Sequence, residues 1–212
     1  MCMNLKSLTS MGPWVAILGL LSMGSITYAA DAESGKQLYQ SCISCHGDQA
    51  QGNDAMGTPA LAGQSATYLV RQLGHFQSGL RGSEDSFAEQ MKAQVASLSE
   101  TDVADVSAYL ATLAPAKSPR ASGDMRLGNN YYHGSCGGCH GGKAEGNDKL
   151  NAPRLAGLSA DYLKRQYLHF KSGARGSDAG DRYGRQMKMM AQVLPDDATL
   201  DHVIAYITAQ AQ

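Results

Sequence analysis

The sequence predicts an all-α protein built from two tandem helical domains. Two observations carry this prediction: the second half of the chain repeats the first, and apolar residues recur at helical spacing without the sustained alternation of a sheet. Of the 212 residues, 43% are hydrophobic and 17% are charged, which indicates a folded chain rather than a disordered one. The formal net charge of −1 argues against a nucleic-acid partner, because nucleic-acid binders carry a basic excess.

Residues 1–30 differ in kind from the rest of the chain. No charged residue lies between Lys6 and Asp31, and the apolar stretch ends in the small residues Ala29 and Ala30. A basic start, a short apolar centre and small residues at the end are typical of a secretory signal peptide. We expect export to the periplasm with cleavage near the end of this segment. The alternative is a retained membrane anchor, which the Pro, Gly and Ser residues of the stretch disfavour.

An internal repeat occupies the remaining chain. With a shift of 94 positions, residues 42–82 align with residues 136–176 without a gap, and 24 of the 41 pairs are identical. Beyond this block the shift becomes 96, a small insertion of the kind that loops accept. We therefore expect one domain at 31–114 and a second at 124–212. The stretch 115–123, rich in Pro, Ser and small residues, is predicted to link them.

Both repeats predict the same series of helices. A first helix leads into a pair of cysteines, and a second is expected to begin at the N-cap Ser65 and to end near Gly79, with counterparts 94 positions on. A last helix is expected to begin at Ser99, which has Asp102 three positions on and so predicts a capping box. The second copy has Pro195 where this serine is expected.

Each repeat carries a Cys-x-x-Cys-His run. The members are Cys42, Cys45 and His46 in the first repeat and Cys136, Cys139 and His140 in the second. This run is the attachment motif of c-type haem. On a helix the two sulfur atoms lie one turn apart and reach the vinyl-derived carbons at one porphyrin edge, while the adjoining imidazole reaches the iron. We expect two covalently bound haem c groups, with both histidines as axial iron ligands.

Three other roles for these cysteines fit the sequence less well. Export favours disulfides, but the four cysteines form pairs three residues apart, each followed by His. A redox dithiol needs a single pair without the His, in a βαβ setting. The two cysteine pairs of a structural zinc site lie within about 15–20 residues of each other. Here the pairs are 94 residues apart.

The sixth iron ligand decides whether such a centre carries electrons or reacts with small molecules. Met91 and Met187 are repeat-equivalent, and each lies seven residues before a Leu. We therefore expect both methionines as distal ligands, and a thioether in that position favours ferrous iron and closes the site. The alternative is that they pack in the core. His75 and His169 are also repeat-equivalent, but each lies within a helix beside a Phe. We expect these histidines at a surface or a domain interface rather than on iron.

These residues resemble the dihaem cytochrome c4 family over essentially the whole chain after residue 30. The resemblance rests on the CxxCHG, P-x-LAG and Y-L-x-R-Q segments and on the distal methionines. It implies two cytochrome c-like domains, each a small helical bundle around covalent haem, whose haems face each other across the domain interface. It also implies that the carbonyls of Pro59 and Pro153 accept a hydrogen bond from the proximal histidines. His75 and His169 depart from the family, which more often has an acidic or other polar residue there.

The two halves of the chain carry opposite charge. Residues 31–114 hold 4 basic and 10 acidic side chains, a net charge of −6, whereas residues 115–212 hold 13 and 9, a net charge of +4. Such a molecule presents two differently charged faces, as expected if one domain meets an electron donor and the other an acceptor. The alternative is that composition drifted after duplication.

We therefore expect a periplasmic electron carrier that is not an enzyme, with redox proteins as partners and a terminal oxidase as the acceptor that the resemblance implies. One rival is an electron-transfer subunit of a dehydrogenase or oxidase complex, which an uncleaved signal or the partner would hold at a membrane. A second rival is a dihaem enzyme, such as a peroxidase or a thiosulfate dehydrogenase. The latter typically binds one iron through an additional cysteine, and the chain after residue 30 has only the four cysteines of its two motifs.

Overall fold

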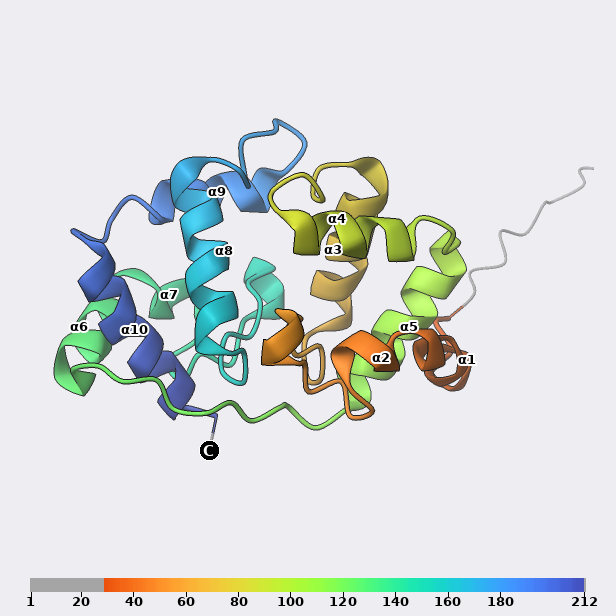
Figure 1. Ribbon diagram of the computed structural model, residues 1–212, viewed down its shortest axis with the longest axis horizontal. Coiled ribbons are helices and arrows are strands. Elements are labelled where there is room, and N and C mark those ends of the chain that lie inside the picture. The colour runs from red at the N-terminus through yellow and green to blue at the C-terminus, as the bar shows by residue number, and fades with distance from the viewer. Residues whose placement is uncertain (1–28, 212) are drawn as a thin grey trace, which may run out of the picture.

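The structure is a computed structural model that describes residues 29–211, so most of the expected signal peptide lies outside the described residues. The described chain forms two helical domains that lie side by side, joined by an extended segment along one edge of the molecule (Figure 1). Residues 29–211 contain helices and two isolated β-bridges but no strand, which confirms the expected all-α class. None of these helices is both long enough and apolar enough to cross a membrane.

The helices follow the same order in both domains. The N-terminal domain contains α1 (Ala32–Leu38), η1 (Tyr39–Ser41), α2 (Ile43–His46), η2 (Asp54–Met56), α3 (Ala66–Ser78), α4 (Ser86–Val95) and α5 (Glu100–Thr112). The C-terminal domain contains α6 (Met125–Ser135), α7 (Gly137–His140), η3 (Asp148–Leu150), α8 (Ala160–Ser172), α9 (Arg182–Met190) and α10 (Asp197–Ala209).

The first and last helices of each domain cross at close contact. A Cβ atom at Gly35 of α1 would overlap the backbone carbonyl oxygen of Asp105 in α5, and a Cβ at Gly128 of α6 would overlap that of His202 in α10. Only glycine allows the helices this approach. Each crossing therefore fixes the helix that leads into the Cys-x-x-Cys-His run.

The helix ends follow the expected caps with one shift. The Ser65 side chain accepts a hydrogen bond from the third residue of α3, and that helix ends at Gly79 in the left-handed region. Ser99 and Asp102 form the capping box of α5, as the sequence predicts. In the second domain the cap moves one residue past Pro195, because a proline has no hydroxyl to accept from the helix; Asp196 caps α10 instead.

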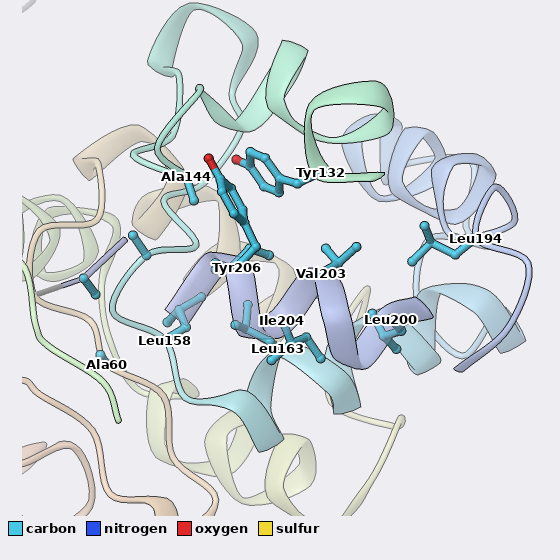
Figure 2. Close-up of a cluster of buried hydrophobic side chains, with 13 residues drawn as sticks. Ala60, Tyr132, Ala144, Leu158, Leu163, Leu194, Leu200, Val203, Ile204 and Tyr206 are labelled. Atoms are coloured by element: carbon cyan, nitrogen blue, oxygen red, sulfur yellow. The ribbon is translucent and has the colours of Figure 1, made fainter. Parts of the chain in front are cut away.

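Each domain surrounds its own cluster of buried apolar side chains. In the C-terminal domain, Tyr132 of α6, Leu163 of α8 and Ile204 of α10 meet in the cluster drawn in Figure 2. Ala60 of the N-terminal domain belongs to the same cluster, so the domains share part of this core. Cys136 packs against the cluster, which places the cysteine motif at its edge.

Candidate haem sites

The cysteine motifs fold as single helical turns. In the first motif the backbone N–H groups of Cys45 and His46 donate to the Cys42 carbonyl at 3.2 and 2.9 Å. The second motif repeats this arrangement at 3.1 and 3.0 Å. Both cysteines of each pair therefore lie on one turn directly before the histidine, as covalent attachment requires.

Each motif histidine is buried and held by a proline carbonyl. The Nδ1 atom of His46 lies 2.9 Å from the oxygen of Pro59, and the Nδ1 of His140 lies 2.9 Å from the oxygen of Pro153. A carbonyl oxygen only accepts, so Nδ1 carries the proton and Nε2 keeps its lone pair for a metal. Burial lowers the pKa of both histidines, which favours the neutral, metal-binding form. These contacts match those that the family resemblance implies.

A cavity in the C-terminal domain brings together the site residues that the sequence predicts there. Cys136, Cys139 and His140 line it, and Met187 reaches it from α9. Its other lining residues are mostly apolar, among them Phe170. A planar apolar macrocycle fits such a lining, with the two thiols and the free Nε2 of the histidine available for attachment and ligation.

The N-terminal site is built from equivalent residues. Cys42 and Met91 both pack against the N-terminal core cluster, together with Tyr68 and Leu98. His46 is 5% exposed, the same fraction as its counterpart in the second domain. Met91 therefore lies beside the core of the domain that carries its predicted partner His46, while Met187 lines the same cavity as its predicted partner His140.

The cysteine environment disfavours redox chemistry at the thiols. All four motif cysteines are unpaired in the structure, and the two pairs lie in different domains. Burial raises the pKa of the Cys136 thiol to about 11, and burial also raises the pKa of Cys42. The reactive form of a redox dithiol is the thiolate, which such burial suppresses near neutral pH.

The domain interface contains a buried polar network. Arg81 and Arg175 each donate to the side-chain oxygens of both Gln72 and Gln166. The Nε atoms of the two arginines lie 3.5 and 3.7 Å from the same carboxylate oxygen of Glu84. Sequence reasoning missed this cluster: repeat equivalence marks the arginines and glutamines as pairs, but it does not show that the pairs meet.

The two rival histidines lie at this interface, as the sequence predicts. His75 of α3 faces Asp181 of the C-terminal domain, and His169 of α8 faces Asp85 of the N-terminal domain. Neither histidine is among the residues that line the C-terminal cavity. The aspartates are the N-caps of the helices that carry the candidate methionines.

In comparisons with known proteins, both halves of the chain match the same protein family. Residues 32–114 and 125–210 match the family model described as cytochrome c. The chain is 30% identical to cytochrome c4 of Azotobacter vinelandii over 187 residues, which cover 82% of this chain and 88% of that protein. It is 32% identical to a thiosulfate dehydrogenase electron acceptor of Thiomonas intermedia over 179 residues, 78% of this chain and 80% of that protein.

Solved structures show the same two-domain arrangement. Reduced recombinant cytochrome c4 from Pseudomonas stutzeri superposes with a TM-score of 0.70 at 28% identity, covering 85% of this chain and 98% of that one. Thiosulfate dehydrogenase from Marichromatium purpuratum superposes with a TM-score of 0.68 at 27% identity, covering 83% of this chain and 39% of that chain.

Proposed function

This chain belongs to the dihaem cytochrome c4 family, and we propose that it is an exported carrier that passes single electrons between respiratory proteins in the periplasm, towards a terminal oxidase. Its two cytochrome c domains imply two covalent haem groups. The observation that carries the proposal is the C-terminal cavity, where the cysteine pair, His140 and Met187 line one apolar space. We take 31–114 and 124–212 as the two electron-transfer domains, with 115–123 as their linker.

Each domain is proposed to hold its haem through three kinds of side chain. Thioether bonds form at Cys42 and Cys45 and at Cys136 and Cys139; His46 and His140 are the proximal ligands; Met91 and Met187 are the distal ligands. A haem iron held by these residues would supply one-electron chemistry. The carbonyls that accept from the Nδ1–H groups fix both imidazole rings, so little reorganises during transfer. Protein ligands on both sides leave no open position for a substrate, which favours a carrier over an enzyme.

Electrons are proposed to cross the mouth of the C-terminal cavity. Leu150, Met190 and Val193 line the cavity and are also 47%, 39% and 48% exposed, so they form an apolar rim. The C-terminal half carries the positive net charge, so we expect an acidic redox partner at this rim. The N-terminal half carries the negative net charge, so we expect its partner to be basic.

A second candidate function is that of electron acceptor for thiosulfate dehydrogenase. The observation that favours it is the relative of that name from Thiomonas intermedia and the likeness to a thiosulfate dehydrogenase structure. The two functions use the same haems and differ in the donor. Purified chain mixed with thiosulfate and a thiosulfate dehydrogenase is reduced at a catalytic rate only if the second candidate holds.

A redox titration with added ligands tests the carrier proposal. We expect the haem-loaded protein to take up two electrons per chain reversibly, and its ferrous spectrum to stay unchanged on addition of carbon monoxide, because methionine occupies the sixth position. Immediate carbon monoxide binding at either iron contradicts the carrier assignment and favours an enzyme with an open site.

A further inference from the structure

Each domain extends an arginine across the interface to a ring of the other domain. Arg71 of α3 extends from the N-terminal domain, and its guanidinium lies 4.5 Å from the ring centroid of Tyr183 in α9 of the C-terminal domain. Its Nη2 donates to the backbone carbonyl of Asn151 at 2.9 Å, and its Nη1 donates to the Asn151 side-chain oxygen at 3.1 Å. The Asn151 amide nitrogen in turn donates to the Tyr183 hydroxyl at 2.9 Å.

An arginine of the C-terminal domain makes the equivalent contact with the N-terminal domain. The guanidinium of Arg165 in α8 lies 4.6 Å from the ring centroid of Phe87 in α4. Its Nη2 donates to the carbonyl of Gly57 at 2.6 Å, and its Nε lies 3.3 Å from Oδ2 of Asp85. Asp85 is the N-cap of α4, so this arginine holds both the first turn of the helix and its cap.

The two contacts are equivalent by the internal repeat. Arg71 and Arg165 differ by 94 positions, as do the residues whose carbonyls accept from them, Asn151 and Gly57. Phe87 and Tyr183 differ by 96. These are the shifts that relate the two copies on either side of the insertion. The two arginine–ring contacts therefore follow from the way the two repeats pair, and neither is a chance surface contact.

The ring that each arginine stacks on lies one helical turn from the candidate distal ligand of the same domain as the ring. Tyr183 precedes Met187 by four residues in α9, and Phe87 precedes Met91 by four residues in α4. Residues four apart lie on the same face of a helix. In the C-terminal domain the arrangement is direct, since Arg71, Tyr183 and Met187 all line the cavity that also contains His140.

We propose that Arg71 and Arg165 are positioning residues that act across the interface: Arg71 holds α9 and so sets the position of Met187, and Arg165 holds α4 and so sets the position of Met91. The inference rests on the proposed function, in which these methionines bind iron. An arginine suits this role because its planar guanidinium stacks on a ring while its fork donates several hydrogen bonds. A lysine keeps the charge but loses the planar stack and the fork.

Reciprocal lysine variants of the haem-loaded full chain test the proposal. Arg71→Lys and Arg165→Lys are compared by cyanide titration of the oxidised protein, with NMR signals of the two iron-bound methionine methyl groups as the site-specific readout. We expect Arg71→Lys to make Met187 about fivefold easier to displace, corresponding to about 1 kcal/mol of lost positioning, and to leave Met91 unchanged. Arg165→Lys is expected to show the opposite pattern.

The position of the effect decides the outcome. A change confined to the domain that carries the substitution, or no change in either methionine, overturns the proposal. Tyr183→Leu and Phe87→Leu remove the rings while keeping the arginines, and they are expected to loosen Met187 and Met91 respectively. If the ring variants have no effect, the arginines do not act through the helices and the proposal is wrong.

A matched control tests whether an arginine-to-lysine change elsewhere on α9 also loosens the methionine. Arg185 is exposed on α9, and Arg185→Lys is expected to leave both methionine signals as in the unsubstituted protein. Failure of the underlying function has a different signature, because the unsubstituted protein itself then shows no methionine signal at either iron.

Discussion

The Nδ1 atom of His75 lies 3.9 Å from Oδ1 of Asp181, and the two residues belong to different domains. The repeat produces the reciprocal contact, with Nε2 of His169 3.6 Å from Oδ2 of Asp85. Both histidine side chains are less than one-fifth exposed. The interface between the two proposed redox centres therefore contains a pair of half-buried titratable groups.

The pH dependence of stability follows from these histidines. Burial is the largest influence on His75 and His169 and lowers the pKa of both below 6.5, while the facing aspartates oppose the shift and nearby arginines add to it. The unfolded chain then binds protons more readily than the folded chain as the pH falls through about 6.5. We expect the free energy of unfolding to decrease with falling pH from that point, measured by denaturant titration of the haem-loaded protein.

A double variant isolates this contribution. Replacing His75 and His169 by Asn removes both titrating rings, so the loss of stability as the pH falls below about 6.5 is expected to shrink. His46 and His140 do not contribute in this window if iron occupies their Nε2 atoms. An unchanged pH profile in the double variant contradicts the assignment to the interface histidines.

The helix crossing at Gly35 is expected to tolerate no side chain. In Gly35→Ala the added Cβ would overlap the backbone carbonyl of Asp105, which cannot move without shifting α5. We expect the free energy of unfolding to fall by about 3 kcal/mol, measured by denaturant titration. Gly74 in α3 is the matched control, since no atom lies within 4 Å of a Cβ built there. Gly74→Ala is expected to stabilise by about 0.5–1 kcal/mol, and equal effects at both sites would contradict the close approach.

Glu84 is expected to stabilise the domain interface. Its carboxylate lies between the guanidinium groups of Arg81 and Arg175, and its side chain is 1% exposed. Glu84→Gln leaves the two buried cations without this counter-charge, so we expect a loss of about 3 kcal/mol in the free energy of unfolding. Glu89 is exposed on α4, and Glu89→Gln is expected to change stability by less than about 0.5 kcal/mol. Equal stabilities for the two variants would show that Glu84 contributes nothing at the interface.

The distal ligands are tested by the weak sulfur-to-iron absorption band near the red edge of the oxidised spectrum. Met91→Ala and Met187→Ala are each expected to remove half of the band, because each deletes one of two equivalent sulfur ligands. Met189 is the control: it is 66% exposed, and Met189→Ala is expected to leave the band intact. A full band in either of the first two variants would mean that another residue binds that iron.

Much of the fold could be predicted from the sequence because its signals are local. The cap at Ser65, the capping box of Ser99 with Asp102, and the paired cysteine motifs depend on residues a few positions apart. The exception is the start of α10, where Pro195 removes the expected hydroxyl and the neighbouring Asp196 takes its place. A strict transfer from the first repeat puts that cap one residue too early.

The interface could not be predicted in the same way. The repeat identifies Arg71 and Arg165 as equivalent, but each has its partner in the other copy, about 80–110 positions away in the chain. Glu84 lies just past the ungapped block, where the shift changes from 94 to 96, so self-comparison assigns it no single counterpart and gives no reason to single it out. Contacts of this kind depend on how the two domains dock, which local spacing does not encode.

The intact mass of the denatured, purified protein, matured in a haem-attaching host, tests the central claim most directly. Two haem groups joined to Cys42, Cys45, Cys136 and Cys139 remain bound when the fold is lost, so we expect the polypeptide mass plus that of two haems. The mass of the bare polypeptide, or of the polypeptide with a single haem, would contradict the assignment of both sites.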